Sequence, residues 1–237
     1  MKVLVVNDDG VYSEGIKLLV EKLYKYCEKI WVVAPMEEKS ATSHSLTIRQ
    51  GLSYKKLDNI YKDVETYAIS GSPADCVSFA YSYFKFDFDT VFSGVNRGYN
   101  LADDIIYSGT IAGASEGIMK GKRGVAVSCK YDSFEALNQF DNVMEYLLNS
   151  QLWNEKVLIN INIPKDAKGI KITHQAKSTY QIEFIRKEDG LLYSSCDTSY
   201  PLVGDDNGDL QTIKQGYISI SPLTIDSTDY NIYNKYH

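Results

Sequence analysis

Residues 3–10, VLVVNDDG, are the stretch of sequence that decides the fold. The apolar run 3–6 is typical of a strand that is buried on both faces of a parallel sheet. It is followed by apolar residues at helical spacing in 16–27 and by a second apolar run at 30–34, and a strand–helix–strand unit closes onto a parallel sheet. Because open sheets of this kind bind ligands outside the carboxyl ends of their strands, we expect Asp8 and Asp9 at the functional edge.

The alternation of strands and helices continues to about residue 164. We predict strands or extended segments at 46–54, 65–69, 90–93, 124–129 and 157–163, and helices at 111–119 and 134–148. Another helix is expected to begin with Ser72 as its N-cap and Pro73 in its first turn.

The last third of the chain has a different sequence pattern. From about residue 165 only short β-like pieces remain, at 170–173, 182–186, 191–193 and 217–221, between polar stretches. The acidic run 205–209 resembles a calcium loop but lacks the downstream Glu that such a loop needs, so we expect a solvated loop.

Composition is that of an ordinary globular protein with an acidic balance. The chain has 237 residues, 44% of them hydrophobic and 24% charged, and its formal net charge is -6. This length is enough for one α/β domain with an appended arm. This charge and the lack of a Lys/Arg-rich run argue against a duplex nucleic-acid partner. No apolar run approaches the ~20 residues of a membrane helix, and no signal-peptide pattern opens the chain, so we expect no membrane partner. The four widely spaced cysteines are expected to be reduced thiols of a cytoplasmic protein.

Three loops at the expected functional edge carry oxygen ligands. Asp8 and Asp9 follow the first strand, Ser40 lies in a hydroxyl-rich segment after the second, and Asn96 follows the strand at 90–93. Adjacent carboxylates repel each other when both are ionised, so a cation is expected beside them. This set of oxygens suits Mg²⁺ or Mn²⁺ rather than tetrahedral zinc. The alternative is that these are ordinary turn residues of solvated loops.

A fourth loop, Ser108-Gly109-Thr110, opens a helix of small residues. Free backbone N–H groups and the positive end of the helix dipole make such a turn suitable for a phosphate; the alternative is a plain N-cap at Ser108. Ser43 and His44, in the loop of Ser40, are expected to face the substrate, with His44 donating to a phosphate or moving protons. An ordinary loop histidine is the alternative.

A cation beside a phosphate-binding turn indicates hydrolysis of a phosphate ester. The chain contains no Gly-x-Gly-x-x-Gly, no P-loop and no Gly-x-Ser-x-Gly, which argues against dinucleotide enzymes, P-loop enzymes and serine hydrolases. A metal-dependent binding module without catalytic activity is the alternative from another class.

Six motifs, in this order along nearly the whole chain, resemble those of the SurE, or survival protein E, nucleotidases. They are Asn7-Asp8-Asp9-Gly10; Ala34-Pro35 leading to Ser40 and Ser45-Leu46-Thr47; Gly71-Ser72-Pro73-Ala74-Asp75-Cys76; Ser93-Gly94-Val95-Asn96-Arg97-Gly98-Tyr99-Asn100; Tyr107-Ser108-Gly109-Thr110; and Gly216-Tyr217-Ile218-Ser219-Ile220-Ser221-Pro222-Leu223.

The resemblance implies a fold and an assembly. The expected fold is α/β, a Rossmann-like, mostly parallel sheet flanked by helices at 1–164, followed at 165–237 by a C-terminal β-rich oligomerisation arm that completes the single domain. The arm would exchange between the subunits of a homodimer or homotetramer. The last third would then find its partner strands on another chain, which would explain why the alternation of elements is lost there.

The resemblance also implies an activity, a metal-dependent phosphomonoesterase acting on nucleoside 5′- and 3′-monophosphates. One divalent cation per subunit would be held by Asp8, Asp9, Ser40 and Asn96, and the segment 108–110 matches the family's phosphate-facing turn. Residues 36–39 (MEEK) depart from the pattern of many relatives, an acidic residue followed by basic and amide residues, and Ala41 stands where Gly is common. Neither departure removes a predicted ligand.

The resulting hypothesis gives catalytic roles to Asp8, Asn96 and Ser108. A water activated by the cation attacks phosphorus in line and Asp8 accepts its proton, while N–H groups at 108–110 and at Asn96 hold the other phosphoryl oxygens. A variant is direct attack by Asp8 to give an aspartyl-phosphate.

Overall fold

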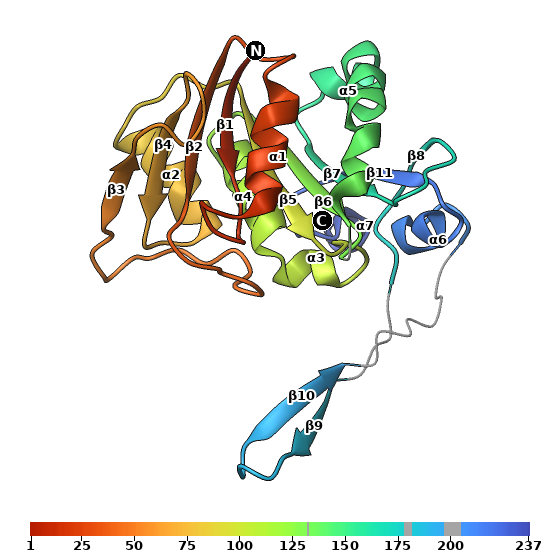
Figure 1. The fold of residues 1–237 in the computed structure, drawn as a ribbon. Helices are drawn as coiled ribbons and strands as arrows, with labels where there is room; N and C mark the ends of the chain where they lie inside the picture. Colours follow the sequence, from red (N-terminus) through yellow and green to blue (C-terminus); the bar gives the residue numbers. More distant parts are fainter. Residues whose placement is uncertain (132, 178–181, 197–204) are drawn as a thin grey trace.

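The fold is a nine-stranded sheet with helices on both faces (Figure 1). The structure, a computed structural model, describes residues 1–131, 133–177, 182–196 and 205–237. The strands run, in their order across the sheet, β3 (Tyr54–Leu57), β4 (Glu65–Ile69), β2 (Lys29–Pro35), β1 (Lys2–Val6), β5 (Thr90–Arg97), β6 (Arg123–Cys129), β7 (Leu158–Ile163), β11 (Ile218–Leu223) and β8 (Ile170–Ile172). Neighbouring strands are parallel except in the pairs β3–β4 and β7–β11. The predicted α/β fold with a mostly parallel sheet is confirmed.

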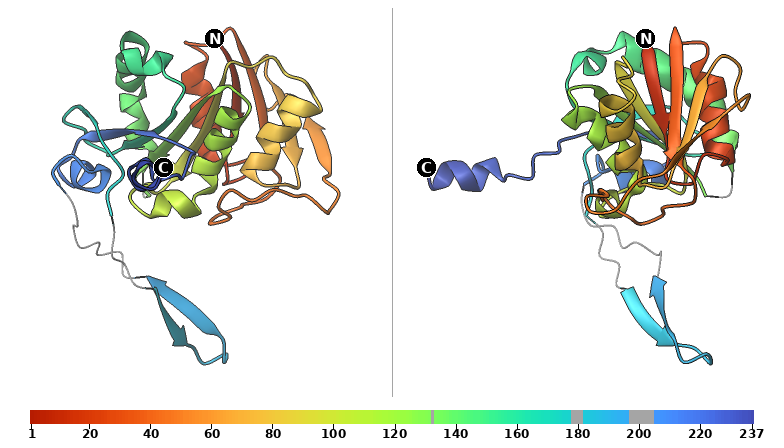
Figure 2. Two further views of the ribbon diagram at one scale, coloured as in Figure 1. Left: turned by 180° about the vertical axis from the view of Figure 1, so that it is seen from behind. Right: turned by 90° about the vertical axis from the view of Figure 1, so that its left-hand side faces the viewer.

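Helices form a layer on each face of this sheet (Figures 1 and 2). On one face, α1 (Glu14–Leu23) and α5 (Phe140–Asn149) pack on Val3 and Val5 of β1 and their neighbours. On the other, α2 (Pro73–Ser82) and α4 (Gly109–Met119) cover the opposite side chains of the strands. The shorter helices are α3 (Asp104–Tyr107), α6 (Asp209–Lys214), α7 (Tyr230–Lys235) and the 3-10 helices η1 (Phe134–Gln139) and η2 (Gln151–Asn154). Strand β1 is therefore buried on both faces, as its apolar run predicts.

Local signals account for the start of α2 and for most strands. Ser72 Oγ accepts from the N–H of Asp75 at 3.1 Å, and Asp75 Oδ2 accepts from the N–H of Ser72 at 2.9 Å, so the predicted N-cap is part of a capping box. Strand β5 is longer than predicted, because Asn96 and Arg97 continue to pair with β6 after an irregularity that follows Gly94. The segment 46–53 forms no strand, and the expected helix at 134–148 begins with the 3-10 turn η1.

The C-terminal third belongs in part to the core. Strand β11 pairs with β7 and β8 pairs with β11, all within the same chain, so the expectation that this third finds its partner strands on another chain is wrong for these two. Two parts project instead. The hairpin of β9 (Ile182–Arg186) and β10 (Leu192–Cys196) stands away from the body (Figure 1), and α7 extends outward (Figure 2). Positions 178–181 and 197–204 of the expected arm lie outside the described residues.

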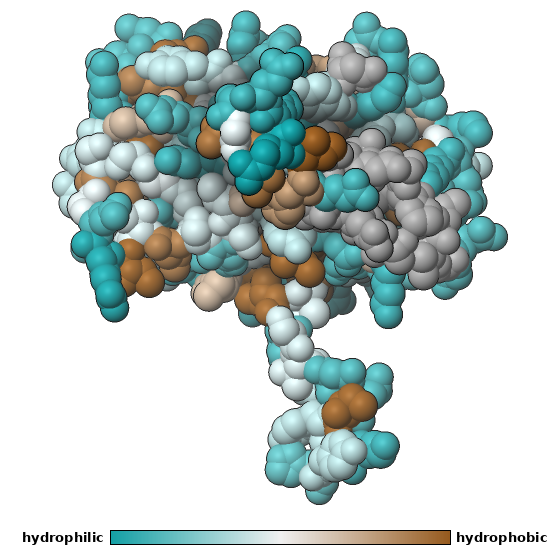
Figure 3. Space-filling model, turned by 90° about the horizontal axis from the view of Figure 1, so that it is seen from below, coloured by the Kyte–Doolittle hydropathy of each residue, from teal (hydrophilic) through white to brown (hydrophobic). Residues whose placement is uncertain are grey.

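Seen from below, hydrophobic residues lie at the base of the projecting C-terminal segment, and much of the surrounding surface is hydrophilic (Figure 3). The acidic run 205–209 is a solvated turn only in its first part. Asp209 is fully buried and accepts from the N–H groups of Ala102 and Ala176, both at 3.0 Å. The prediction of a solvated loop is therefore wrong for Asp209, which ties the start of α6 to the body.

Among the helices that the structure describes, none has the length and apolar character to cross a membrane. Cys76 and Cys129 are buried thiols and Cys27 is a partly buried one. The side chain of Cys196 lies outside the described part of the structure.

A buried group of asparagines fixes the chain that follows β5. The N–H of Asn100 donates to Asn162 Oδ1 at 2.8 Å, and the side chains of Asn162 and Asn160 donate back to the carbonyl of Asn100 at 3.0 and 2.9 Å. All three residues are buried, so these hydrogen bonds satisfy polar groups that water does not reach.

We expect Asn162→Ala to lower the free energy of unfolding by about 2–3 kcal/mol, because it leaves the buried N–H of Asn100 without its partner. Urea denaturation measures this, with exposed Asn142→Ala as the control, for which the stability should stay within about 0.5 kcal/mol of the wild type. Equal stability of the two variants would contradict this account of the buried group.

Candidate functional site

The predicted carboxylates lie at the switch point of the sheet. From β1 the chain first forms β2, β3 and β4 on one side of it, and then β5, β6 and β7 on the other. The carboxyl ends of β1 and β5 therefore border the crevice in which open sheets bind their ligands. Asp8 and Asp9 follow β1 directly, in a turn closed by Asn7, whose side chain donates to the carbonyl of Gly10 at 2.9 Å. Gly10 adopts a φ of 96° in this turn, a conformation that favours glycine.

Asp8 is held against the start of α4. Thr110 Oγ1 donates to Asp8 Oδ1 at 2.6 Å. A Cβ atom at Gly109 would lie 2.9 Å from Asp8 Cβ and 3.0 Å from Oδ2, so only glycine lets this carboxylate approach the helix so closely. Burial raises the pKa of Asp8, and hydrogen bonds from Thr110 oppose that rise. The carboxylate thus has a fixed position and a costly negative charge.

Asp9 has an unsatisfied oxygen. Its Oδ2 is buried and has no hydrogen-bond partner among the described residues. Burial raises the pKa of Asp9 to about 6, with the charges of Asp8 and Glu38 acting in the same direction, while the charge and backbone of Arg97 oppose the rise. A buried anionic oxygen without a donor, beside a second carboxylate, is the environment that a bound cation would relieve.

Asn96 lies near the end of β5, next to Arg97, whose backbone hydrogen-bonds Asp9. Its amide nitrogen donates to the carbonyl of Gly98 at 2.9 Å. This bond orients the amide, and within the described part of the chain no group donates to its oxygen. The amide oxygen, which is the ligand atom that the sequence predicts, is thereby left available.

Ser40 is exposed on the loop after β2, and this loop lies over Asp8. The N–H of Lys39 donates to the carbonyl of Asp8 at 2.7 Å, and Ser40 Oγ donates to Glu38 Oε1 at 2.5 Å. Glu38 therefore orients the predicted ligand and adds negative charge near Asp8 and Asp9. Sequence reasoning treated 36–39 only as a departure from the family pattern and missed this residue.

We expect Glu38→Gln to weaken the binding of Mn²⁺ by roughly 10-fold, the effect of losing an outer-shell partner of a metal ligand. Titration calorimetry of the purified protein measures it. Glu37→Gln, one residue away in the same exposed loop, is the control and should bind Mn²⁺ as the wild type does. Unchanged affinity in both variants would remove Glu38 from the site.

The rest of this loop is tied down at several points. Ser43 donates through its N–H and its Oγ to the carbonyls of Tyr107 and Ile106, at 3.0 and 2.7 Å. Thr47 donates through its N–H and Oγ1 to Asp75, at 2.9 and 2.8 Å. The loop therefore bridges α3 and the capping box of α2, and Ser43 serves as an anchor.

His44 lies beside a buried carboxylate that sequence reasoning missed. Glu116 of α4 is 1% exposed and contacts His44 Nε2 at 3.0 Å, Lys120 Nζ at 2.8 Å and Ser78 Oγ at 2.6 Å. Burial acts to raise the pKa of Glu116, but the hydrogen bonds from these three partners outweigh it and lower the pKa to about 2. The sequence signal that could have identified Glu116 is an acidic residue in the middle of a helix of small residues.

Ser108 is the N-cap of α4, since its Oγ accepts from the N–H of Ile111 at 3.1 Å. The plain N-cap reading is therefore part of its role. Because α4 is an 11-residue helix, its start also carries the partial positive charge that attracts anions. Gly109 and Thr110 place this start against Asp8, so the metal-binding and phosphate-binding candidates adjoin.

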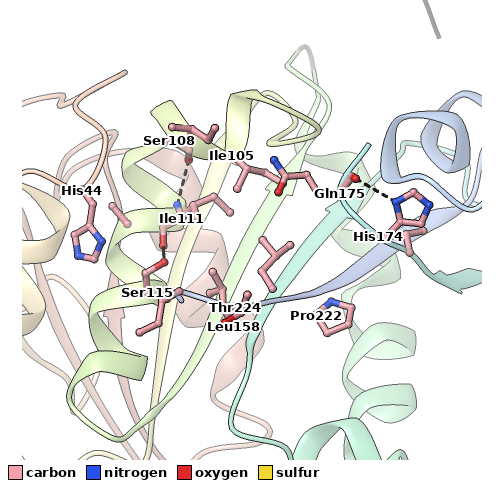
Figure 4. A pocket seen from close by; sticks show the side chains of 15 residues that line it. His44, Ile105, Ser108, Ile111, Ser115, Leu158, His174, Gln175, Pro222 and Thr224 are labelled. Atoms are coloured by element: carbon pink, nitrogen blue, oxygen red, sulfur yellow. Dashed lines mark hydrogen bonds between the residues drawn. The ribbon is translucent and has the colours of Figure 1, made fainter. Parts of the chain in front are cut away.

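A cavity of about 560 Å³ opens beside α4 (Figure 4). Ser108, Ile111 and Ser115 line it from α4, Leu158 from β7, and Pro222 and Leu223 from β11, with His44 and His174 also on its wall. Ser108 thus belongs both to the predicted phosphate-binding turn and to this cavity. Asp8, Asp9, Ser40 and Asn96 are not among its lining residues.

Among the described residues, no group of three or more His, Cys, Asp or Glu side chains forms a metal site. A cation here would therefore need the neutral oxygens of Ser40 and Asn96 in addition to the two carboxylates. This donor set fits Mg²⁺ or Mn²⁺, which accept hydroxyl, amide and water oxygens.

Comparison with known proteins points to one family. A model of the family described as survival protein SurE matches residues 3–182. The protein named 5′-nucleotidase SurE from Petrotoga mobilis is 38% identical over 99% of this chain and 97% of its own, and the one from Clostridium beijerinckii is 34% identical over 98% and 96%. The crystal structure of the SurE protein from Aquifex aeolicus superposes with a TM-score of 0.81 and 31% identity, covering 99% of this chain and 98% of that one.

Proposed function

The chain belongs to the SurE family of survival proteins, and from this premise we propose how it works as a nucleotidase. It hydrolyses nucleoside 5′-monophosphates, and 3′-monophosphates as well, to nucleoside and phosphate. One Mg²⁺ or Mn²⁺ per subunit is held by Asp8, Asp9, Ser40 and Asn96. The observation that carries the metal site is the buried, unpartnered oxygen of Asp9 beside a second carboxylate.

The cation, when bound, supplies positive charge to the phosphoryl oxygens and lowers the pKa of a water. The chain's own residues do the rest. Thr110 holds the Asp8 carboxylate through Oδ1, and this carboxylate takes the proton of the attacking water. The start of α4 at Ser108 attracts the phosphate through its partial positive charge, and the amide of Asn96 is oriented by its hydrogen bond to the carbonyl of Gly98.

Hydrolysis of a panel of nucleoside monophosphates, with and without EDTA, tests the proposal. We expect EDTA and Asp8→Asn each to abolish phosphate release, and Mn²⁺ or Mg²⁺ to restore it to the EDTA-treated wild type. Full activity in EDTA would refute the metal site. A wild type that binds nucleotide but hydrolyses no ester would favour the metal-dependent binding module.

Direct attack by Asp8 is the alternative chemistry, and a single turnover in ¹⁸O water tests for it. Label found in the carboxylate of Asp8 shows that an aspartyl-phosphate forms and that water then attacks its carbonyl carbon, which refutes direct water attack on the substrate. Label found only in the released phosphate shows that water attacks phosphorus, either in the substrate or in an aspartyl-phosphate.

We propose that the chain self-associates, as a homodimer or homotetramer, through the two projecting parts of its C-terminal third. The exposed β9–β10 hairpin and α7 support this, since Phe184, Tyr230 and Ile232 are each more than half exposed. Removal of 226–237 should reduce the assembly size in light scattering, and an unchanged size would refute a role for α7. The reduced thiols of Cys27, Cys76 and Cys129 fit a reducing compartment such as the cytoplasm.

A further inference from the structure

A second cavity lies at the edge of the sheet opposite to the metal-binding candidates. Three of its lining residues mark the amino ends of parallel strands, since Asp89 precedes β5, Arg123 begins β6 and Lys156 lies just before β7. We propose that this cavity binds a small phosphate-bearing anion. The site is distinct from the phosphate-binding turn at the start of α4, and it goes beyond the proposed nucleotidase function.

The size and lining of this cavity suit a small, charged ligand. Its volume of about 340 Å³ lies near the lower end of the roughly 300–1,000 Å³ that is usual for small-ligand sites. Ile118 gives it an apolar contact, and most of its other lining side chains are polar or charged. Inorganic phosphate or pyrophosphate fits this character better than a large apolar ligand does.

The charge of the cavity is positive on a chain whose formal net charge is -6. Three cations line it, against the two carboxylates Asp89 and Glu155. Within the described residues, none of the three cations forms an ion pair with a carboxylate. Cations that are gathered in a cavity without such partners attract an anion. The three are Lys122, Arg123 and Lys156.

The guanidinium group of Arg123 is fixed before any ligand arrives. Its Cζ lies 4.1 Å from the centroid of the Trp153 ring, and its Nε donates to the carbonyl of Trp153 at 2.8 Å. Its Nη1 donates to Thr90 Oγ1 at 3.2 Å, while Nη2 has no hydrogen-bond partner among the described residues. A guanidinium group that is already held in place loses little freedom when it binds a phosphate oxygen.

The two lysines of the cavity differ in what else they do. Lys122 follows the end of α4, where a cation complements the helix dipole, and its Nζ lies 5.5 Å from the centroid of the Phe88 ring. Lys156 comes from the separate, exposed segment before β7. In the part of the chain that the structure describes, it has neither an aromatic nor a carboxylate partner. Its charge therefore reports on the cavity itself, and its replacement leaves the packing of the core unchanged.

Calorimetry with inorganic phosphate and pyrophosphate tests the site in metal-free protein from which the chelator has been dialysed. Lys156→Glu should weaken binding about 10-fold or more through reversed charge, and Arg123→Lys about 10-fold through the lost hydrogen bond. Lys55→Glu makes the same charge change on exposed β3, at the far side of the sheet, and should stay within about twofold of the wild type. Equal affinity in Lys156→Glu and the wild type would overturn the proposal. Ethyl phosphate, titrated in the same way, distinguishes a site for the free ion from one for a phosphate ester.

Asp89→Asn supplies a gain of binding that a damaged structure could not produce. Asp89 Oδ2 accepts from the N–H of Lys2 at 2.9 Å, and the amide oxygen of Asn can accept the same bond. Removing a negative charge from the cavity wall should tighten the binding of pyrophosphate several-fold. Unchanged or weaker binding would overturn the proposal. Because no catalysis is measured, a wild type that hydrolyses no ester but shows these changes would refute the proposed function and leave this site standing.

Discussion

Asp9→Asn is expected to stabilise the metal-free protein while abolishing its metal-dependent activity. The folded chain holds the Asp9 carboxylate in a partly buried place, near Asp8 and Glu38, with one oxygen unpartnered. Asn has the same shape without the charge, so the repulsion and the cost of burying a charge disappear. The same change removes a carboxylate ligand, so the phosphatase activity with Mn²⁺ should fall by about 10³-fold or more.

The stabilisation should depend on pH in a definite direction. Burial, first, and the charges of Asp8 and Glu38 raise the pKa of folded Asp9 to about 6, against about 3.9 in an unfolded chain. Below pH 4 both states are protonated and the group costs nothing. Above pH 6 the folded state alone bears the penalty, so wild-type stability falls as pH rises through this window, by roughly 3 kcal/mol at most.

Urea denaturation in EDTA at pH 4.5 and pH 8 measures this difference. Asp9→Asn should exceed the wild type by roughly 1–3 kcal/mol at pH 8 and by much less at pH 4.5. Adding Mn²⁺ should stabilise the wild type and leave the variant unchanged. Asp166→Asn, at an exposed carboxylate, is the control and should match the wild type at both pH values. A less stable Asp9→Asn protein at pH 8 would contradict the reading of this carboxylate.

Gly109→Ala is expected to lower kcat/KM by about 100-fold without unfolding the protein. The added Cβ would lie 2.9 Å from Asp8 Cβ and 3.0 Å from Asp8 Oδ2, closer than such atoms pack. The side chain of Asp8 must then move away from the start of α4. A displacement of about 1 Å at a catalytic group costs about 100-fold in rate, and Thr110 would lose its partner at 2.6 Å.

The control for this variant is Gly51→Ala, because a Cβ at Gly51 would meet nothing within 4 Å. It should keep full activity. Circular dichroism of Gly109→Ala should show an intact helix content, since alanine favours helices over glycine by about 1 kcal/mol. Full activity of Gly109→Ala would show that Asp8 does not need its position against α4.

Much of the fold was predictable from local pattern. The run 3–6 has apolar side chains on both faces and is buried on both. Ser72 and Pro73 carry a start signal for α2 that needs no tertiary information. The place of Asp8 and Asp9 at the carboxyl edge of the sheet was predictable because the end of a parallel strand fixes where the next residues lie.

What failed depends on contacts between distant segments. Asn96 reads as a loop residue after Gly94, but pairing with Ser128 keeps it in β5. Strands β8 and β11 were predicted as short β-like pieces, but their partners were not: β11 pairs with β7, and β8 pairs with β11. Glu116 was missed because its role comes from His44, which is distant in the sequence. Glu38 was missed because its charge acts on Asp8 and Asp9, which lie on another loop.

The buried carboxylate of Glu116 also constrains how the sequence can change over evolution. Ser78, His44 and Lys120 all direct polar groups at it, and replacing Glu116 alone would leave those groups unpaired or the space half empty. Single substitutions at these four positions should therefore be rare among relatives. Relatives that lack the acid at position 116 should also have other residues at the three partner positions. The four positions should therefore covary, while exposed neighbours vary independently.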